Sequence, residues 1–233
     1  MGRVSGFGRL GATDMTAARR FDLIAFDWDG TLFDSTELIT RCIQAACADV
    51  GTPVPSSRDA SFVIGLGLAD ALRHAAPTLP GERHRELAER YRHHYFARQH
   101  EILMFDGALP MLHALKQRHR LAVATGKTRR GLDEALKSSQ LAGIFEATRT
   151  ADETASKPNP RMLLELMDEL GVPPERTLMI GDTTHDLQLA ANAGTPSIAV
   201  SYGAHEHSEF DSFEPLFVAH SVAELHAWLF EHG

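Results

Sequence analysis

The chain has 233 residues, of which 43% are hydrophobic and 23% are charged, a balance typical of a folded globular protein with a sizeable core. Its formal net charge of -8, with no strong basic patch to offset it, disfavours nucleic acid as a partner. No apolar run is long enough to span a bilayer, so we expect no membrane partner either.

The first twenty residues are rich in glycine and arginine and show no apolar periodicity. We predict a flexible tail over residues 1–20, with Met15 as a candidate for the natural start of the folded part. The two cysteines, Cys42 and Cys47, lie five apart on one predicted helix and give neither a disulfide framework nor a metal-ligand spacing. A reducing, cytoplasmic compartment fits this composition best.

An apolar run from Leu23 to Phe26 predicts the first buried strand, which stops at two carboxylates, Asp27 and Asp29. In open α/β sheets, ligands bind beyond the carboxyl ends of the strands, where a substrate could reach both acids. Gly30 would let the backbone turn and approach a ligand closely. The competing interpretation is an ordinary Asp-Gly turn after a strand.

A helical stretch follows this strand. Asp34 or Ser35 could cap the first helix, with Glu37 placed as in a capping box, and apolar residues then recur at three- and four-residue steps until Gly51. Further helices are expected over residues 58–64, 68–75 and 81–100, and no strand is evident among them. Because a helical block of this length exceeds a simple crossover, residues 36–100 are predicted to form an inserted all-helical domain.

Strands and helices alternate from Phe105 onward. Helices are expected over residues 109–117, 129–137, 161–170, 186–192 and 222–230, and strands over 121–125, around 147, over 177–180 and over 197–200. This alternation predicts an α/β fold with a doubly wound, Rossmann-like parallel sheet. The core domain would comprise residues 21–35 and 101–233, with residues 36–100 as a helical cap domain.

Two more predicted strands end in residues suited to phosphate chemistry. Thr125 and Gly126 close one strand, where a hydroxyl and backbone N–H groups can hold a phosphate oxygen, although a Thr-Gly turn is the competing interpretation. Asp182 closes another strand, and a carboxylate there suits Mg²⁺. Asp186 has two open interpretations, a second metal-binding acid or an N-cap acid favoured by the helix dipole.

Two lysines lie close to these strand ends. Lys157 precedes the helix over 161–170, and the two prolines that follow it fix the approach of the chain, so its ammonium is held in a defined place. A compact positive charge of this kind suits a phosphoryl group. Lys127, two residues after Thr125, is a candidate for an additional phosphate contact. For both lysines, a solvated surface position is the competing interpretation.

Four short motifs therefore stand in order along the chain. They are Asp27-Trp28-Asp29-Gly30-Thr31, the strand end at Thr125, Lys157-Pro158-Asn159-Pro160, and Gly181-Asp182-Thr183-Thr184-His185-Asp186. Together they resemble the DxDGT, Ser/Thr, KPxP and GDxxxD motifs of the haloacid dehalogenase superfamily. The chain most resembles its phosphoglycolate-phosphatase-like branch, which carries a helical cap after the first motif. Trp28 replaces a smaller aliphatic residue, and we expect little effect because the family uses its backbone.

This resemblance implies a Mg²⁺-dependent phosphatase in which Asp27 attacks phosphorus and forms an aspartyl-phosphate. Asp29 would protonate the leaving oxygen and later deprotonate the hydrolytic water. Mg²⁺ would be held by Asp27, the carbonyl of Asp29 and Asp182. The phosphate would be held by Lys157, Thr125 and the N–H groups of Trp28 and Gly126, with Asp186, Thr31 and Lys127 in supporting positions.

The resemblance also implies a small anionic phosphorylated substrate, with phosphoglycolate as an obvious candidate, selected by the helical cap. The loop Gly65-Leu66-Gly67-Leu68 is the best candidate to enter the site, because glycine permits a close approach. Residues 36–100 carry eight basic side chains against seven acidic ones. This excess suits a lid that meets anionic substrates, although solvated helix faces would give the same count.

Two other functions remain open. A phosphomutase of the same fold would pass the phosphoryl group to a phosphosugar instead of water. A non-catalytic binding protein would keep the fold without turnover, but the intact acids and Lys157 argue against it. Dehalogenase chemistry is disfavoured, because it requires neither Mg²⁺ nor the acid at Asp29.

Overall fold

The computed structural model describes residues 19–139 and 141–233. The expected start at Met15 and all of the predicted tail except Arg19 and Arg20 lie outside the described residues. Within the described part of the chain, no helix combines the length and the apolar character needed to cross a membrane.

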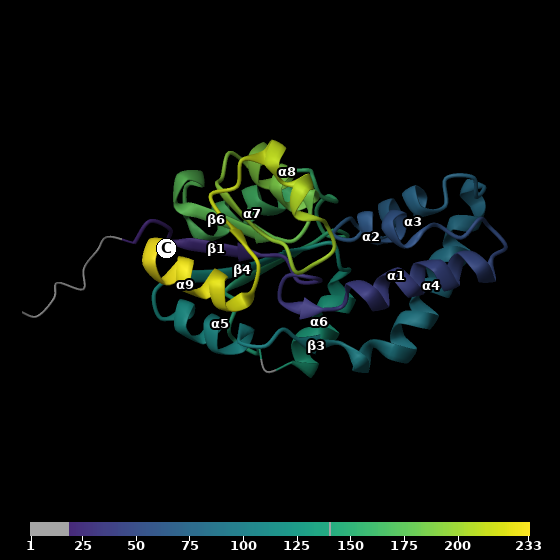
Figure 1. Ribbon diagram of the computed structural model, residues 1–233, viewed down its shortest axis with the longest axis horizontal. Helices are drawn as coiled ribbons and strands as arrows, with labels where there is room; N and C mark the ends of the chain where they lie inside the picture. Colours follow the sequence, from purple (N-terminus) through teal and green to yellow (C-terminus); the bar gives the residue numbers. More distant parts are fainter. Residues whose placement is uncertain (1–18, 140) are drawn as a thin grey trace, which may run out of the picture.

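A parallel sheet of six strands forms the centre of the fold, in the order β5-β4-β1-β6-β7-β8 (Figure 1). The strands are β1 (Leu23–Phe26), β4 (Arg120–Thr125), β5 (Ala147–Thr150), β6 (Thr177–Gly181), β7 (Ser197–Val200) and β8 (Val218–Ala219). The last residues of the central strand align with its neighbours, since Phe26 pairs with Val123 and with Ile180. The residues that follow β1, β4 and β6 therefore meet at one edge of the sheet.

Helices cover both faces of this sheet, as the doubly wound prediction requires (Figure 1). One face packs on α5 (Ala108–Lys116), α6 (Arg129–Ser138) and α9 (Val222–His232), and the other on α7 (Arg161–Leu170) and α8 (Thr184–Ala193). The central strand β1 and the middle residues of β4 and β6 are continuous apolar runs, because both faces are buried. The predicted α/β fold is thereby confirmed.

Four helices lie beyond the carboxyl edge of the sheet (Figure 1). They are α1 (Thr36–Asp49), α2 (Ser57–Phe62), α3 (Leu68–Ala75) and α4 (His84–Arg98), and we call them the helical insert. They enclose an apolar core of their own, which includes Ile43, Leu72 and Leu87. The insert is joined to the sheet through a short antiparallel pair, β2 (Phe33–Asp34) with β3 (Leu103–Met104). The division of the chain into a cap domain and a core domain stays a prediction.

Several local expectations were wrong in detail. The first helix has Ser35 as its N-cap, but no side chain caps it, because the Ser35 hydroxyl donates to Asp29 instead. The single helix expected over 81–100 is α4 flanked by short 3-10 turns. Those turns are Gly81–Arg83 and Gln99–Glu101, and others are Pro174–Arg176, His207–Glu209 and Asp211–Phe213. The strands β2, β3 and β8 have two residues each, too few to show a period-two pattern.

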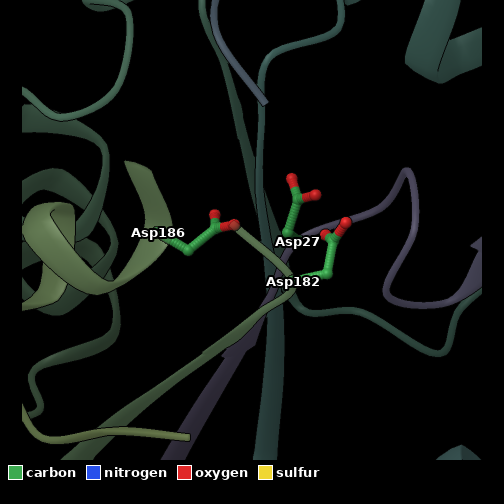
Figure 2. A group of neighbouring side chains, drawn as sticks. All are labelled: Asp27, Asp182 and Asp186. Carbon is green, nitrogen blue, oxygen red and sulfur yellow. The ribbon is translucent and has the colours of Figure 1, made fainter. Parts of the chain in front are cut away.

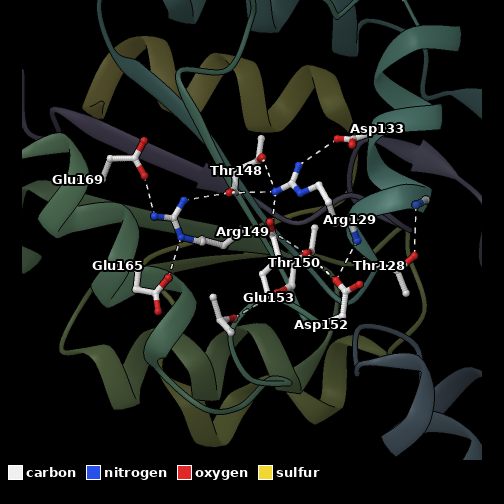
Figure 3. Close-up of polar contacts among 12 residues, drawn as sticks. Thr128, Arg129, Asp133, Thr148, Arg149, Thr150, Asp152, Glu153, Glu165 and Glu169 are labelled. Carbon is white, nitrogen blue, oxygen red and sulfur yellow. Dashed lines mark hydrogen bonds and ion pairs between the residues drawn. The ribbon is translucent and has the colours of Figure 1, made fainter.

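A polar network around β5 holds the loop that leads to Lys157 (Figure 3). The Arg129 side chain, at the start of α6, pairs with Glu153 at 2.7 Å, and its backbone N–H donates to Asp152 at 2.8 Å. On the other side of the strand, Arg149 pairs with Glu165 of α7 at 2.8 Å. These contacts connect the loop after β5 to α6, and β5 itself to α7.

Candidate active site

Asp27 and Lys157 meet at the carboxyl edge of the sheet. Asp27 follows β1, and its backbone N–H donates to the carbonyl of Ile180 in the neighbouring strand. The Lys157 Nζ atom donates to Asp27 Oδ1 at 2.5 Å and to Asp186 Oδ1 at 2.6 Å. All three charged side chains are fully buried, so Lys157 is no surface lysine. One ammonium therefore holds two carboxylates in place.

Asp182 follows β6 directly, and Asp186 lies in the first turn of α8. The Thr31 hydroxyl donates to Asp182 Oδ1 at 2.9 Å, and the Ala204 N–H donates to Asp182 Oδ2 at 2.7 Å. Asp186 stands at the third position of α8, where it forms a capping box with the N-cap Thr183. It was expected as the N-cap itself or as a metal-binding acid. The structure makes it a capping-box acid whose other oxygen faces Lys157.

Glycines give these acids the space they need. A Cβ on Gly30, whose φ is +80°, would lie 2.1 Å from Asp182 Oδ2, and one on Gly203 would lie 2.2 Å from the same atom. A Cβ on Gly181 would lie 2.2 Å from Asp186. Gly30 was expected to permit close approach of a ligand, and what it admits is the Asp182 side chain.

The three acids form a group able to hold a metal ion (Figure 2). One oxygen from each of Asp27, Asp182 and Asp186 lies within 4.8 Å of the others. Asp27 Oδ2 is buried and has no hydrogen-bond partner among the described residues. Carboxylate oxygens with lone pairs free to coordinate are the ligands that Mg²⁺ prefers, so the donor set fits this ion. The Asp29 carbonyl is not part of this side-chain group, and its role as a ligand stays a prediction.

The buried group carries more negative than positive charge. Burial raises the pKa of Asp27 to about 7, against the opposing attraction of Lys157. Burial, reinforced by Asp27 and Asp186, raises the pKa of Asp182 well above its ordinary range. The Lys157 pKa is raised in turn, because Asp186 and Asp27 outweigh the burial that opposes its charge. Three buried carboxylates share one ammonium, and a bound cation would relieve their mutual repulsion.

Asp29 stands apart from this group and faces a different lysine. The Lys127 Nζ lies 2.9 Å from Asp29 Oδ1, and the Ser35 hydroxyl donates to the same oxygen at 2.8 Å. Lys127 also donates to the Tyr95 hydroxyl of α4 at 3.0 Å. The Lys127 side chain is only 10% exposed, which excludes the surface position considered for it. Tyr95 thus connects the helical insert to an acid of the sheet edge.

A cavity of about 110 Å³, which we call the edge cavity, lies between the sheet edge and the insert. Asp27, Asp29, Thr125 and Gly126 line it from the sheet side. The expected loop does reach it, since a Cβ on Gly126 would lie 2.4 Å from the Leu66 carbonyl oxygen. Gly126 is therefore needed for the insert to approach the sheet edge.

The loop of the insert also contacts the other motifs. The Gly67 N–H donates to the Ser156 hydroxyl at 2.8 Å, and a Cβ on Gly65 would lie 3.0 Å from the Thr183 hydroxyl oxygen. The Trp28 side chain is buried away from these groups, where it stacks on Phe33 at 4.6 Å between ring centroids. Trp28 is thus accommodated by the apolar core.

Two histidines also join the insert to the core. His185 Nε2 and His205 Nε2 lie 2.8 Å and 3.0 Å from the carbonyl oxygen of Phe62, the last residue of α2. The Thr184 N–H donates to His205 Nδ1, so Nε2 is the His205 nitrogen that carries the proton. Only tertiary contacts reveal this pair. By contrast, the Thr183-x-x-Asp186 spacing is a capping-box signal that the sequence did contain.

The sequence model of the family described as haloacid dehalogenase-like hydrolase matches residues 24–200 of the chain. That range contains every acid and lysine of the site. The chain belongs to the haloacid dehalogenase-like hydrolase family. The resemblance seen in the four motifs is thereby confirmed.

Several known proteins similar to the chain are named as phosphatases. A phosphoglycolate phosphatase of Aliivibrio fischeri is 33% identical over 218 residues, which cover 89% of this chain and 96% of that protein. Pyrophosphatase PpaX of Halalkalibacterium halodurans is 31% identical over 205 residues, covering 87% and 94%. A solved structure described as a predicted phosphatase from Clostridium acetobutylicum superposes with a TM-score of 0.80 at 26% identity, covering 91% and 99%. These relatives share the enzyme class and differ in substrate.

Proposed function

We propose that this haloacid dehalogenase-like phosphatase is Mg²⁺-dependent and hydrolyses a small phosphomonoester through an aspartyl-phosphate on Asp27. One observation carries the proposal: at the end of the central strand, one oxygen of Asp27 is fixed by Lys157 and the other has no partner among the described residues. That free oxygen belongs to a side chain that lines the edge cavity. A positioned carboxylate with one free oxygen suits attack on phosphorus.

The first half-reaction transfers the phosphoryl group to the enzyme. An Asp27 oxygen attacks phosphorus, the bond from phosphorus to the leaving oxygen breaks, and Asp29 gives that oxygen a proton. Both contacts of the Asp29 side chain use Oδ1, which leaves Oδ2 for the proton transfer. Lys157 holds Asp27 in line throughout, because its ammonium donates both to Asp27 Oδ1 and to Asp186 Oδ1.

The second half-reaction returns Asp27 to its starting state. Water attacks phosphorus while Asp29 accepts its proton, and the bond from phosphorus to the Asp27 oxygen breaks to release inorganic phosphate. Asp29 therefore serves as acid and then as base. Thr125 and the N–H groups of Trp28 and Gly126 are proposed to hold the phosphoryl oxygens during both steps.

The metal would be held either by the side chains of Asp27, Asp182 and Asp186, or by Asp27, Asp182 and the carbonyl of Asp29. When bound, Mg²⁺ supplies positive charge beside the phosphoryl oxygens, which is most of what phosphoryl transfer requires. The absence of a nucleic-acid partner and a cytoplasmic location stay predictions from the net charge and the cysteines.

A panel of phosphomonoesters assayed with Mg²⁺ present and chelated tests the proposal. We expect release of inorganic phosphate that needs Mg²⁺ and is lost in Asp27→Asn. Following the phosphoryl group by phosphorus NMR separates hydrolysis from transfer to a phosphosugar, the phosphomutase alternative. Turnover that survives chelation, or product in which a sugar carries the phosphoryl group, would count against the proposal.

A further inference from the structure

The two walls of the edge cavity differ in polarity. The sheet side contributes Asp27, Asp29, Lys127 and small residues. The insert side is mostly apolar, and its residues are Ile39, Ile43, Val63, Ile64, Gly65, Leu66, Leu68, Ala71, Tyr91, Arg92, Tyr95 and Phe96. The part of a substrate that leaves with the alcohol oxygen must lie against this second wall, because the first wall holds the phosphoryl chemistry.

Neither cation at the cavity is available deep inside it. Lys127 is paired with Asp29 and donates to Tyr95, so its charge is already compensated. Its pKa is raised because these partners outweigh the burial that opposes its charge. Arg92 is solvent-exposed, and it lines a second hollow as well, which places it at the rim.

The other arginines of the insert do not compensate for this lack. Six of its eight arginines form ion pairs with carboxylates outside the cavity lining, which explains the excess of basic residues that had suggested a lid for anions. These are Arg41, Arg58, Arg73, Arg83, Arg85 and Arg98. The polar groups that remain in the described insert wall are the Tyr91 and Tyr95 hydroxyls and the exposed Arg92.

A second anionic group on the substrate would therefore be poorly received. Moving a carboxylate from water to an apolar wall is costly unless a cation or hydrogen bonds compensate for it, whereas an alkyl or aromatic group gains from the same burial. Ile43 and Val63 are almost fully buried, so this part of the wall is shielded from bulk water.

We propose, on the basis of the proposed phosphatase function, that the substrate is the phosphomonoester of an uncharged, apolar alcohol. Ile43 and Leu66 would then act as specificity-determining residues on the insert wall. Under this proposal, phosphoglycolate and pyrophosphate, the substrates named for two relatives, are both disfavoured, because each places a second anion against this wall.

Isobutyl phosphate and 2-phosphoglycolate form a matched pair of probes, since the branched methyl groups of one replace the carboxylate oxygens of the other. We would measure kcat/KM for both with the Mg²⁺-loaded enzyme, and their dissociation constants by calorimetry with Asp27→Asn. The expected result is a preference of roughly tenfold or more for isobutyl phosphate, equivalent to about 1.4 kcal/mol. Equal or tighter binding of 2-phosphoglycolate, or no binding of either probe, would overturn the proposal.

A charge placed on the insert wall provides the reciprocal test. Ile43→Lys should shift the preference toward 2-phosphoglycolate by at least tenfold, whereas Ile43→Met, a neutral control of similar length, should not. If circular dichroism shows that Ile43→Lys is unfolded, Leu66→Lys at a half-buried position takes its place. A folded lysine variant with an unchanged preference would contradict the proposal. The dissociation constants test the substrate class even if neither probe is hydrolysed. Absence of hydrolysis would contradict only the proposed phosphatase function.

Discussion

The two sides of the edge cavity enclose the same space, but one side is lined by charged side chains and the other mostly by apolar ones. The sheet edge carries acids and lysines at strand ends, where Lys157 pairs with Asp27 and Asp186, and Lys127 pairs with Asp29. On its side of the cavity, the insert presents aliphatic and aromatic side chains, and the charged residue among them is Arg92 at the rim. This difference indicates that the sheet edge supplies the chemistry and the insert supplies the selection.

Removal of the Lys157 ammonium should have the largest effect, because this group binds both Asp27 and Asp186 at the sheet edge. Lys157→Met leaves Asp27 and Asp186 buried without a cation, and we expect a loss of about 3–5 kcal/mol in the free energy of unfolding. Turnover should fall at least a thousandfold, about 4 kcal/mol in transition-state free energy. Urea unfolding and steady-state kinetics measure the two losses, and Lys137→Met at an exposed site is the control.

Separation of the two sides should have the next largest effect. The added methyl group in Gly126→Ala meets the carbonyls of Gly65 and Leu66, so the loop of the insert must retreat, at a cost of about 1–3 kcal/mol. We expect a higher KM and a lower kcat, with unchanged far-ultraviolet circular dichroism. Gly81→Ala, where a Cβ meets nothing within 4 Å, is the matched control. Unaltered kinetics in Gly126→Ala would show that the insert need not approach the strand end.

The hydrogen bond between Lys127 and Tyr95, one of the polar links between the two sides, should matter less. Tyr95→Phe removes the hydroxyl that accepts a hydrogen bond from Lys127, but the Lys127 contact with Asp29 survives. We expect kcat to fall by a few fold, about 1 kcal/mol, with little change in stability. Tyr91→Phe is the control, because Tyr91 stacks on the same ring and its hydroxyl has no hydrogen bond among the described residues. Equal effects of the two substitutions would deny Tyr95 a role in positioning.

A titrating group far from the cavity provides the smallest test. Burial lowers the pKa of His119 below its ordinary value of 6.5, against the opposing hydrogen bond to the Phe21 carbonyl. The unfolded chain therefore binds a proton that the fold excludes, and stability present above pH 6.5 is lost as the pH falls below it, by at most about 1.4 kcal/mol per pH unit. His119→Asn keeps an N–H donor but does not titrate in this range. The melting temperature of this variant should therefore fall less than that of the wild type between pH 7.5 and 5.5. An identical fall in both proteins would exclude His119 as the source.

Much of the sheet edge was predictable because strand ends carry short local signals. Apolar runs located β1, β4 and β6, and the polar residues that follow them, Asp27, Thr125 and Asp182, share the carboxyl edge as expected. The α7 and β7 bounds were also predicted correctly. The order of the strands then brings distant residues together, which a local pattern encodes only through the rules of α/β topology.

The contacts between the two sides could not be predicted in the same way. The polar sequence of α4 buries only Leu87 and does not show that Tyr95 meets Lys127. The spacing of Lys127 gave no hint of its pairing with Asp29, because that contact depends on the neighbouring strand. The Phe62 carbonyl carries no side-chain signal at all, so the histidines that contact it looked like ordinary surface or core residues.

Trapping of the covalent intermediate tests the central claim most directly. The enzyme would be mixed with a radiolabelled phosphomonoester, quenched in acid and digested, and the labelled peptide identified by mass spectrometry. The account predicts label on the peptide that contains Asp27, and none in Asp27→Asn. Label on another residue, or an Asp27→Asn enzyme that keeps about a tenth of the wild-type turnover, a loss of only about 1.4 kcal/mol, would contradict it.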